Sequence, residues 1–247
     1  MQVAHAMWMY SFAWTQKASC VSIPVSQSSL RMGEVFNAYG RRSAEYVQTL
    51  GSMESTHAED RQLVSRWGRQ INGPIIDVGC GPGHWTDFLN SQGCDVRGID
   101  PTEEFIASAR RRFPDCRFDL GSVESLRADS TMGILAWYSL IHHDPAGLDA
   151  ALQKCSAALA PGGSFLVGFF TAPAHAPFAH AVTTAYFWPL NELVSRIERV
   201  GFTTVEVHER HDASSRPHGA IVAQRSESGA FAETRKAAGF PAASSSG

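Results

Sequence analysis

The chain has no run that approaches the roughly 20 consecutive apolar residues needed to cross a bilayer, so we do not expect a membrane protein. Charged residues are also sparse, at 18% of 247 residues, and the formal net charge is only −3. This balance gives no general attraction to phosphate backbones or anionic lipid, and it argues against nucleic-acid and membrane partners. Apolar residues make up 44%, which allows a buried core, and the length suits one α/β domain.

Cysteine is scarce and follows no pattern. The five cysteines form no C-x-x-C pair and no spacing typical of zinc ligands; they are Cys20, Cys80, Cys94, Cys116 and Cys155. We therefore expect neither a disulfide framework nor a metal site. Scattered thiols of this kind suit a reducing, cytoplasmic compartment.

The N-terminal segment lacks the features of an export signal. Its apolar stretch 4–14 has the length of a signal core, but no lysine or arginine precedes it and no small-residue cleavage site follows. We expect residues 1–31 to be a poorly ordered extension, or the product of a start upstream of Met32. Residues 227–247, rich in Ser, Ala and Gly, are expected to be a flexible tail, which leaves residues 32–226 as the folded domain.

Short apolar runs alternate with amphipathic stretches along most of the chain. The runs predict strands at 75–78, 95–99, 117–119, 133–138 and 164–170. Helical patterns are found at 84–91, 103–113 and 148–159, and Pro161-Gly162-Gly163 should end the last of these before the fifth strand. Repeated βαβ units of this kind predict a mostly parallel sheet.

The flanking segments complete this outline. Segment 171–185 contains two prolines and is expected to be a long loop, followed by a helix at 189–200. Alternating runs at 202–208 and 219–224 predict a hairpin that closes the sheet. Helical patterns at 35–50 and 59–70 either cover the ligand edge of the sheet or pack as ordinary core.

The most informative segment is 75–85, an apolar strand that ends in an acid and a glycine-rich turn. Gly79, Gly81 and Gly83 give the spacing G-x-G-x-G, whereas a dinucleotide dehydrogenase would have a third glycine where this chain has His84. Glycines let backbone pass close to a ligand, and ligands of open α/β sheets lie beyond the carboxyl ends of the strands. The next strand ends in Asp100, whose two oxygens could accept both hydroxyls of a ribose, although it could also simply cap the following helix.

These segments resemble the class I S-adenosylmethionine-dependent methyltransferases, most closely the small-molecule, ubiquinone-biosynthesis-like type, over about residues 35–225. Stretches 118–126 and 134–143 resemble the adenine-flanking segment and the fourth strand with its turn, although Ser122 and Gly133 stand where many members have acids. The resemblance implies a Rossmann-like, doubly wound, mostly parallel seven-stranded sheet with a C-terminal antiparallel hairpin and an N-terminal helical cover. It also implies in-line methyl transfer from S-adenosylmethionine to a small-molecule acceptor that the sequence does not identify.

The same resemblance, together with chain position, assigns residues to the cofactor. They are Asp77, Gly79, Cys80, Gly81, Gly83, Trp85, Asp100, Pro101, Ser122, Val123, Glu124, Trp137, Tyr138 and Tyr39. Tyr39, Tyr46, Trp137 and Tyr138 are candidates for an aromatic face that stabilises the cationic sulfur by about 0.5 to 2 kcal/mol, with packing as the alternative for each.

The acceptor side is less determined. His142 follows the fourth strand and is a candidate general base, or a residue that contacts the cofactor instead. Candidate acceptor-binding residues are His143, His175, His180, Tyr186 and Trp188. The long loop, which carries His175 and His180, could instead be a lid that touches no substrate.

Two other functions remain open at this point, a catalytically inactive S-adenosylmethionine-binding regulator and an NAD-dependent oxidoreductase. The acceptor, the atom that is methylated and the choice between monomer and homodimer are also open.

Deletion of residues 1–31 should leave folding and cofactor affinity intact, because this segment shows no periodicity that a core requires. Thermal melting and calorimetry of the truncated protein would check this. Aggregation would mean that the segment packs on the domain.

Overall fold

The computed structural model describes residues 28–212 and 215–226. Most of the expected N-terminal extension and the whole expected tail, residues 1–27 and 227–247, lie outside these ranges. The first described helix, α3 (Ser28–Arg41), begins four residues before Met32, where we expected the domain to start. Among the described helices, none has the length and apolar character needed to cross a membrane.

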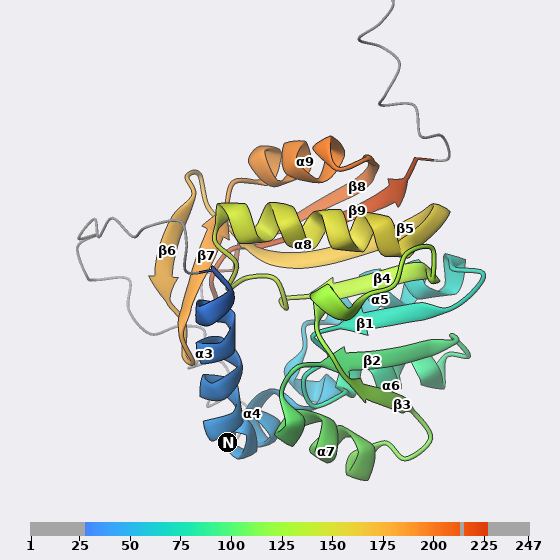
Figure 1. The fold of residues 1–247 in the computed structure, drawn as a ribbon, viewed down its shortest axis with the longest axis vertical. Coiled ribbons are helices and arrows are strands. Elements are labelled where there is room, and N and C mark those ends of the chain that lie inside the picture. Colours follow the sequence, from blue (N-terminus) through green and yellow to red (C-terminus); the bar gives the residue numbers. More distant parts are fainter. Residues whose placement is uncertain (1–27, 213–214, 227–247) are drawn as a thin grey trace, which may run out of the picture.

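A single mixed sheet organises the described residues (Figure 1). Its strands are β1 (Ile75–Val78), β2 (Val96–Asp100), β3 (Arg117–Leu120), β4 (Thr131–Trp137), β5 (Leu159–Thr171), β6 (Ala176–Ala179), β7 (Thr184–Trp188), β8 (Phe202–Arg210) and β9 (His218–Arg225). The order β3-β2-β1-β4-β5 is parallel throughout, and β9 pairs antiparallel with both β5 and β8. The order reverses between β1 and β4, the position at which open α/β sheets bind ligands.

Helices cover both faces of the sheet. They are α4 (Ser43–Leu50), α5 (Ala58–Gln70), α6 (His84–Ser91), α7 (Glu103–Arg112), α8 (Pro145–Ala158) and α9 (Leu190–Arg199), with 3-10 turns η1 (Met53–Ser55) and η2 (Val123–Ser125). Strand β4 shows how the core is divided, because successive side chains point to opposite faces. Ile134 and Ala136 pack with α8 and α9, whereas Leu135 and Trp137 pack with α5 and α6.

The predicted fold class is confirmed, and the predicted strands and helices recur within a few residues. The expected number of strands was wrong, because the sheet of the described residues has nine strands rather than seven. The expected loop at 171–185 was wrong in part, because it contains β6 and the start of β7 as an added hairpin. Pro177 lies in β6, the outermost strand, and an edge strand tolerates a residue without an N–H. The two prolines alone therefore suggested a loop where the chain forms an edge hairpin.

The Pro161-Gly162-Gly163 segment also differs from expectation. The helix ends at Ala158, one residue before its expected end, and β5 begins directly after it, so the segment lies inside β5 and does not itself end the helix. The pairing with β4 jumps from Leu159 opposite Thr131 to Ser164 opposite Gly133, so the extra residues bulge, and Gly162 supplies the positive φ of +75°.

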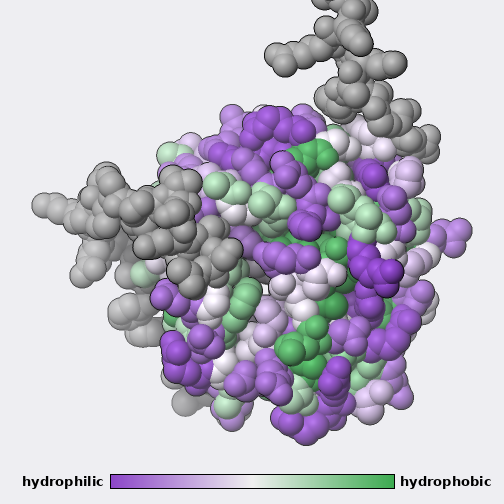
Figure 2. Space-filling model, viewed as in Figure 1, coloured by the Kyte–Doolittle hydropathy of each residue, from purple (hydrophilic) through white to green (hydrophobic). Residues whose placement is uncertain are grey.

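Helix α3 stands across the carboxyl ends of the central strands and next to the β6–β7 hairpin (Figure 1). It contacts α7, as does α4. The same view in space-filling form shows hydrophilic residues around the outline and apolar residues gathered toward the middle of this face (Figure 2). The N-terminal helices therefore cover the edge at which the sheet would bind a ligand.

Candidate functional site

The glycine-rich turn joins β1 to α6 in a conformation that only glycine adopts easily. Gly79, Gly81 and Gly83 all have positive φ, at +69°, +53° and +86°. A Cβ at Gly79 would lie 2.3 Å from that of Ser139, and one at Gly83 would lie 2.7 Å from the Phe118 ring, so both glycines permit close packing. A Cβ at Gly81 would meet nothing within 4 Å, which means that this backbone borders open space.

Asp100, at the end of β2, holds the turn in place. One carboxylate oxygen accepts the N–H of Gly81 at 2.9 Å, and the other accepts the N–H of Thr102 at 2.8 Å. The side chain is buried, and that burial raises its pKa, while the two backbone hydrogen bonds oppose the rise. Because each carboxylate oxygen has a second lone pair, Asp100 can still accept two further hydrogen bonds.

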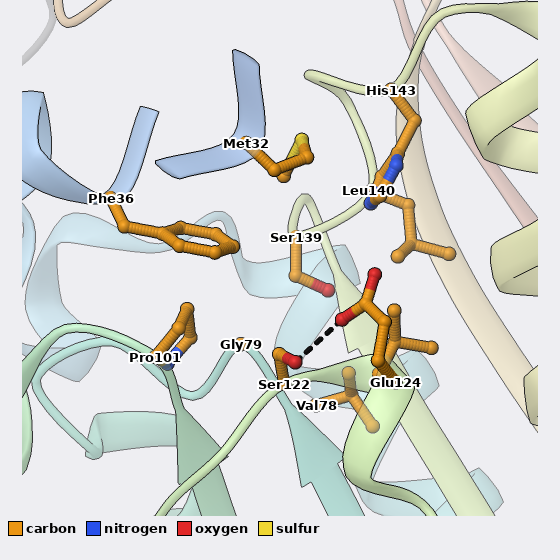
Figure 3. A pocket seen from close by; sticks show the side chains of 11 residues that line it. Met32, Phe36, Val78, Gly79, Pro101, Ser122, Glu124, Ser139, Leu140 and His143 are labelled. Atoms are coloured by element: carbon orange, nitrogen blue, oxygen red, sulfur yellow. Dashed lines mark hydrogen bonds between the residues drawn. The ribbon is translucent and has the colours of Figure 1, made fainter. Parts of the chain in front are cut away.

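A pocket opens at this edge, enclosing about 320 Å³ of space that is partly open to solvent. It is lined by Met32, Phe36, Val78, Gly79, Pro101, Ser122, Val123, Glu124, Ser139, Leu140 and His143. Figure 3 shows Met32 and Phe36 of α3 on one side and the turn after β4 on the other, with Ser122 hydrogen-bonded to Glu124. Apolar walls with a few polar groups are typical of small-molecule sites.

The pocket fits a nucleoside cofactor on structural grounds. The Ser139 hydroxyl lines it and is buried without a hydrogen-bond partner among the described residues, so a ligand could supply one. Gly81 leaves room for close approach, and Asp100 keeps acceptor capacity beside it. Residues 28–212 and 215–226 contain no cluster of three or more side chains that could hold a metal ion.

Three residues assigned to the cofactor support the turn from beneath. Asp77 is buried and accepts a hydrogen bond from the Thr86 hydroxyl at 2.7 Å, and burial raises its pKa to about 7. Cys80 packs with the buried side chains of α7 and β3. Trp85 lies in the core under α5 and contacts Trp137 edge-on at 5.6 Å. None of these side chains lines the pocket.

His142, the candidate base, has both ring nitrogens engaged. Nδ1 is 2.7 Å from the carbonyl oxygen of Thr184, and Nε2 is 2.8 Å from the Tyr39 hydroxyl. Burial lowers the pKa of His142 to about 4, so the ring is neutral near pH 7. Tyr39 also contacts Tyr46 and Phe105 through its ring.

Tyr138 has an unusual backbone conformation directly after β4. Its φ is +55°, a strain of order 1–3 kcal/mol for a residue with a side chain. Its N–H donates to the carbonyl of Gly168, its ring packs on Phe170, and its hydroxyl is hydrogen-bonded to Nδ1 of His218. These contacts hold the phenol at the carboxyl edge beside β5 and β9.

The structure separates the candidate acceptor residues into two groups. His143 lines the pocket, and the His180 ring lies 5.4 Å from that of His142. His175, Tyr186 and Trp188 lie together on the other side of β7, where Trp188 and Tyr186 join the core under α9 and His175 stacks on Tyr186. Of these five candidates, only His143 lines the pocket.

Sequence reasoning missed several residues of this region. Met32, Phe36, Ser139 and Leu140 line the pocket without having been assigned to it, and His218 was not considered. Ser139 directly follows Trp137 and Tyr138, which were assigned to the cofactor, so its place in the chain could have predicted that it lines the pocket. No local signal marks Met32 or His218, because their roles depend on contacts across the chain.

Valine at Gly81 and at Gly83 should have different effects. Both changes impose backbone strain, but at Gly83 the new side chain also collides with Phe118, so we expect a large loss of thermal stability. At Gly81 we expect a modest loss of stability and abolished binding of S-adenosylmethionine. Melting curves and calorimetry would check both.

Gly93→Val is the matched control, since Gly93 has φ of +84° and open space around it, after the end of α6. If Gly81→Val binds the cofactor as well as this control does, Gly81 does not border the ligand.

Comparison with known proteins agrees with this geometry. Residues 75–163 match a family model described as a methyltransferase domain. A malonyl-[acyl-carrier protein] O-methyltransferase of Salmonella typhimurium is 29% identical over 134 residues, 54% of this chain and 51% of that protein. A trans-aconitate 2-methyltransferase of Rhizobium meliloti is 30% identical over 97 residues, 38% of this chain and 37% of that protein. The matched segments thus span about half the length of these curated relatives or less.

Solved structures share the fold. The 1,6-didemethyltoxoflavin-N1-methyltransferase of Burkholderia thailandensis, solved with S-adenosylhomocysteine, superposes with a TM-score of 0.69 at 19% identity, covering 83% of this chain and 93% of that one. A Leishmania major S-adenosylmethionine-dependent methyltransferase gives a TM-score of 0.65 at 16% identity, covering 77% and 82%. Residues 75–163 are therefore similar in sequence to a methyltransferase domain, and the described residues share the fold of these solved methyltransferase structures.

Proposed function

We propose that the chain is an enzyme that transfers a methyl group from S-adenosylmethionine to a small-molecule acceptor. The observation that carries the proposal is the hydrogen bond by which Asp100 holds the G-x-G-x-G turn, next to Gly79 and Pro101, which line the pocket at the β1–β4 switch point. The bound cofactor would supply an electrophilic methyl group on a cationic sulfur. The protein then mainly has to bind the two reactants, align the acceptor with the methyl group and the sulfur, and keep water out of the site.

The proposed binding roles follow from placement. Asp100 would accept the ribose hydroxyls, while Pro101, Ser122, Val123 and Glu124 would surround the adenine. The backbone at Gly79 and Gly81 would lie along the amino-acid part, with Ser139 as a hydrogen-bond partner. Met32 and Phe36 of α3 would cover the ligand.

We further propose that the acceptor is a carboxylic acid methylated on oxygen. The curated relatives named above act on malonyl-[acyl-carrier protein] and trans-aconitate. A carboxylate is already ionised at neutral pH and needs no base. This agrees with a His142 whose two nitrogens are both bound by protein groups. His143 and His180 are the proposed contacts of the acceptor.

We also propose that the protein is located in the cytoplasm, because its cysteines are scattered and suit a reducing compartment.

The test is calorimetry with S-adenosylmethionine and with NAD, followed by turnover on a panel of carboxylic acids, phenols and amines. We expect tight S-adenosylmethionine binding, no NAD binding and formation of S-adenosylhomocysteine with an acid. Binding without turnover on any acceptor would favour an inactive regulator, and NAD binding would favour an oxidoreductase.

Asp100→Ala should weaken S-adenosylmethionine binding by roughly ten- to a hundred-fold, because both the ribose acceptor and the clamp on Gly81 are lost. Calorimetry would measure the change, with a melting curve on the same sample.

The matched control is Asp119→Ala, which removes an exposed carboxylate from the neighbouring strand β3. Equal affinities for these two variants, both folded, would remove Asp100 from the site.

A further inference from the structure

A chain of hydrogen bonds joins three elements at the edge of the pocket. The carbonyl of Thr184, at the start of β7, is 2.7 Å from Nδ1 of His142, and Nε2 of His142 is 2.8 Å from the Tyr39 hydroxyl on α3. The three residues are far apart in sequence, so the fold alone brings them together. The His142 side chain, in the middle of these hydrogen bonds, is buried.

The direction of these hydrogen bonds follows from the chemistry of the groups. A carbonyl oxygen can only accept, so the proton of the neutral His142 ring lies on Nδ1, and Nε2 is an acceptor. The Tyr39 hydroxyl must then donate to Nε2. This uses the only proton of the hydroxyl and leaves its oxygen with lone pairs alone for any other neighbour.

Tyr39 lies close to residues that line the cofactor pocket, although it is not itself one of the lining residues. Phe36, one turn earlier on α3, lines that pocket, and so does His143, the neighbour of His142. The Tyr39 ring is 5.9 Å from that of Phe105, in the first turn of α7 after Asp100 and Pro101. Tyr39 therefore lies where α3, the beginning of α7 and the turn after β4 converge.

We propose that His142 is a positioning residue that acts through Tyr39, and that the oriented Tyr39 oxygen makes the pocket distinguish the cationic sulfonium of S-adenosylmethionine from the neutral thioether of S-adenosylhomocysteine. The inference rests on the proposed function, because it assumes this cofactor. An oxygen that can only accept attracts a positive charge and its polarised C–H groups, whereas a hydroxyl free to turn could present its proton instead. Methyl transfer removes the charge, so the same contact weakens as product forms.

Two titratable side chains next to the Tyr39–His142 pair, Arg42 and His180, do not supply a negative charge that would attract the sulfonium. Arg42, one turn after Tyr39, is paired with Glu45 and donates to the carbonyl of Ala181. His180 contacts the His142 ring, and burial lowers the pKa of His180 to about 3, so it is neutral. Glu124 does line the pocket, where its carboxylate accepts a hydrogen bond from the Ser122 hydroxyl. The described groups that contact the Tyr39–His142 pair contribute no carboxylate.

The experiment measures the ratio of affinities for S-adenosylmethionine and S-adenosylhomocysteine by calorimetry, without turnover. In Tyr39→Phe we expect S-adenosylmethionine to bind roughly three- to ten-fold more weakly, with S-adenosylhomocysteine unchanged. His142→Leu should shift the ratio in the same way. His142→Gln, which keeps an acceptor near the position of Nε2, should restore part of it.

Tyr186→Phe is the matched control, since it loses the same hydroxyl on the other side of β7 and should keep the wild-type ratio. Melting curves identify any variant that fails to fold, and Tyr39→Phe preserves the ring contacts of Tyr39. An unchanged ratio in Tyr39→Phe, or equal weakening of both ligands, would overturn the inference while leaving the cofactor assignment intact. Failure of the wild-type protein to bind either ligand would instead overturn the proposed function.

Discussion

The site depends on the carboxylate of Asp100, which binds the N–H groups of Gly81 and Thr102 at the same time. These two hydrogen bonds tie the end of β2 to the glycine turn after β1 and to the beginning of α7. A buried carboxylate is costly unless its charge is hydrogen-bonded, so the arrangement is held from both sides. Each carboxylate oxygen can accept one more hydrogen bond, and the hydroxyl groups of a bound ligand could donate both.

The glycine turn is in turn held by what lies beneath and beside it. Gly79 packs so closely on Ser139 that the turn after β1 and the turn after β4 are fixed relative to each other. Gly83 does the same for the Phe118 ring of β3. The pocket is therefore bounded by backbone from strands that the sheet already places in register, and helix α3 supplies the remaining wall. Binding geometry here comes from the sheet more than from any flexible segment.

Local chemistry made much of this predictable from sequence. The run Ile75–Val78 followed by three spaced glycines specifies strand, turn and helix within a few residues, and Asp100 follows from the next strand. What could not be predicted depends on contacts over long separations. Tyr39 and His142 are 103 residues apart, and Tyr138 and His218 are 80 apart, so no periodicity connects them.

Strand β7 shows the same limit in another form. Tyr186 and Trp188 were expected to bind the acceptor because they follow the predicted loop in the chain. In a strand, however, successive side chains point to opposite faces. Ala185 and Phe187 therefore face the cluster around Phe170, while Tyr186 and Trp188 face the core under α9. Without knowing that 184–188 is a strand, the alternation could not be applied.

The imidazoles at this edge share one property that bears on the chemistry. Burial lowers the pKa of His142 and of His218 to about 4 and that of His180 to about 3, so all three rings are neutral near pH 7. A neutral imidazole offers one donor and one acceptor, which suits orientation of a polar group better than compensation of a negative charge. Since these rings keep the same charge from mildly acidic to alkaline pH, any pH dependence of the reaction in that range would have to come from ionisation of other groups, with the acceptor as the first candidate. For a carboxylic acid that ionisation is complete well below neutrality, and the enzyme would need only to align an anion that is already reactive.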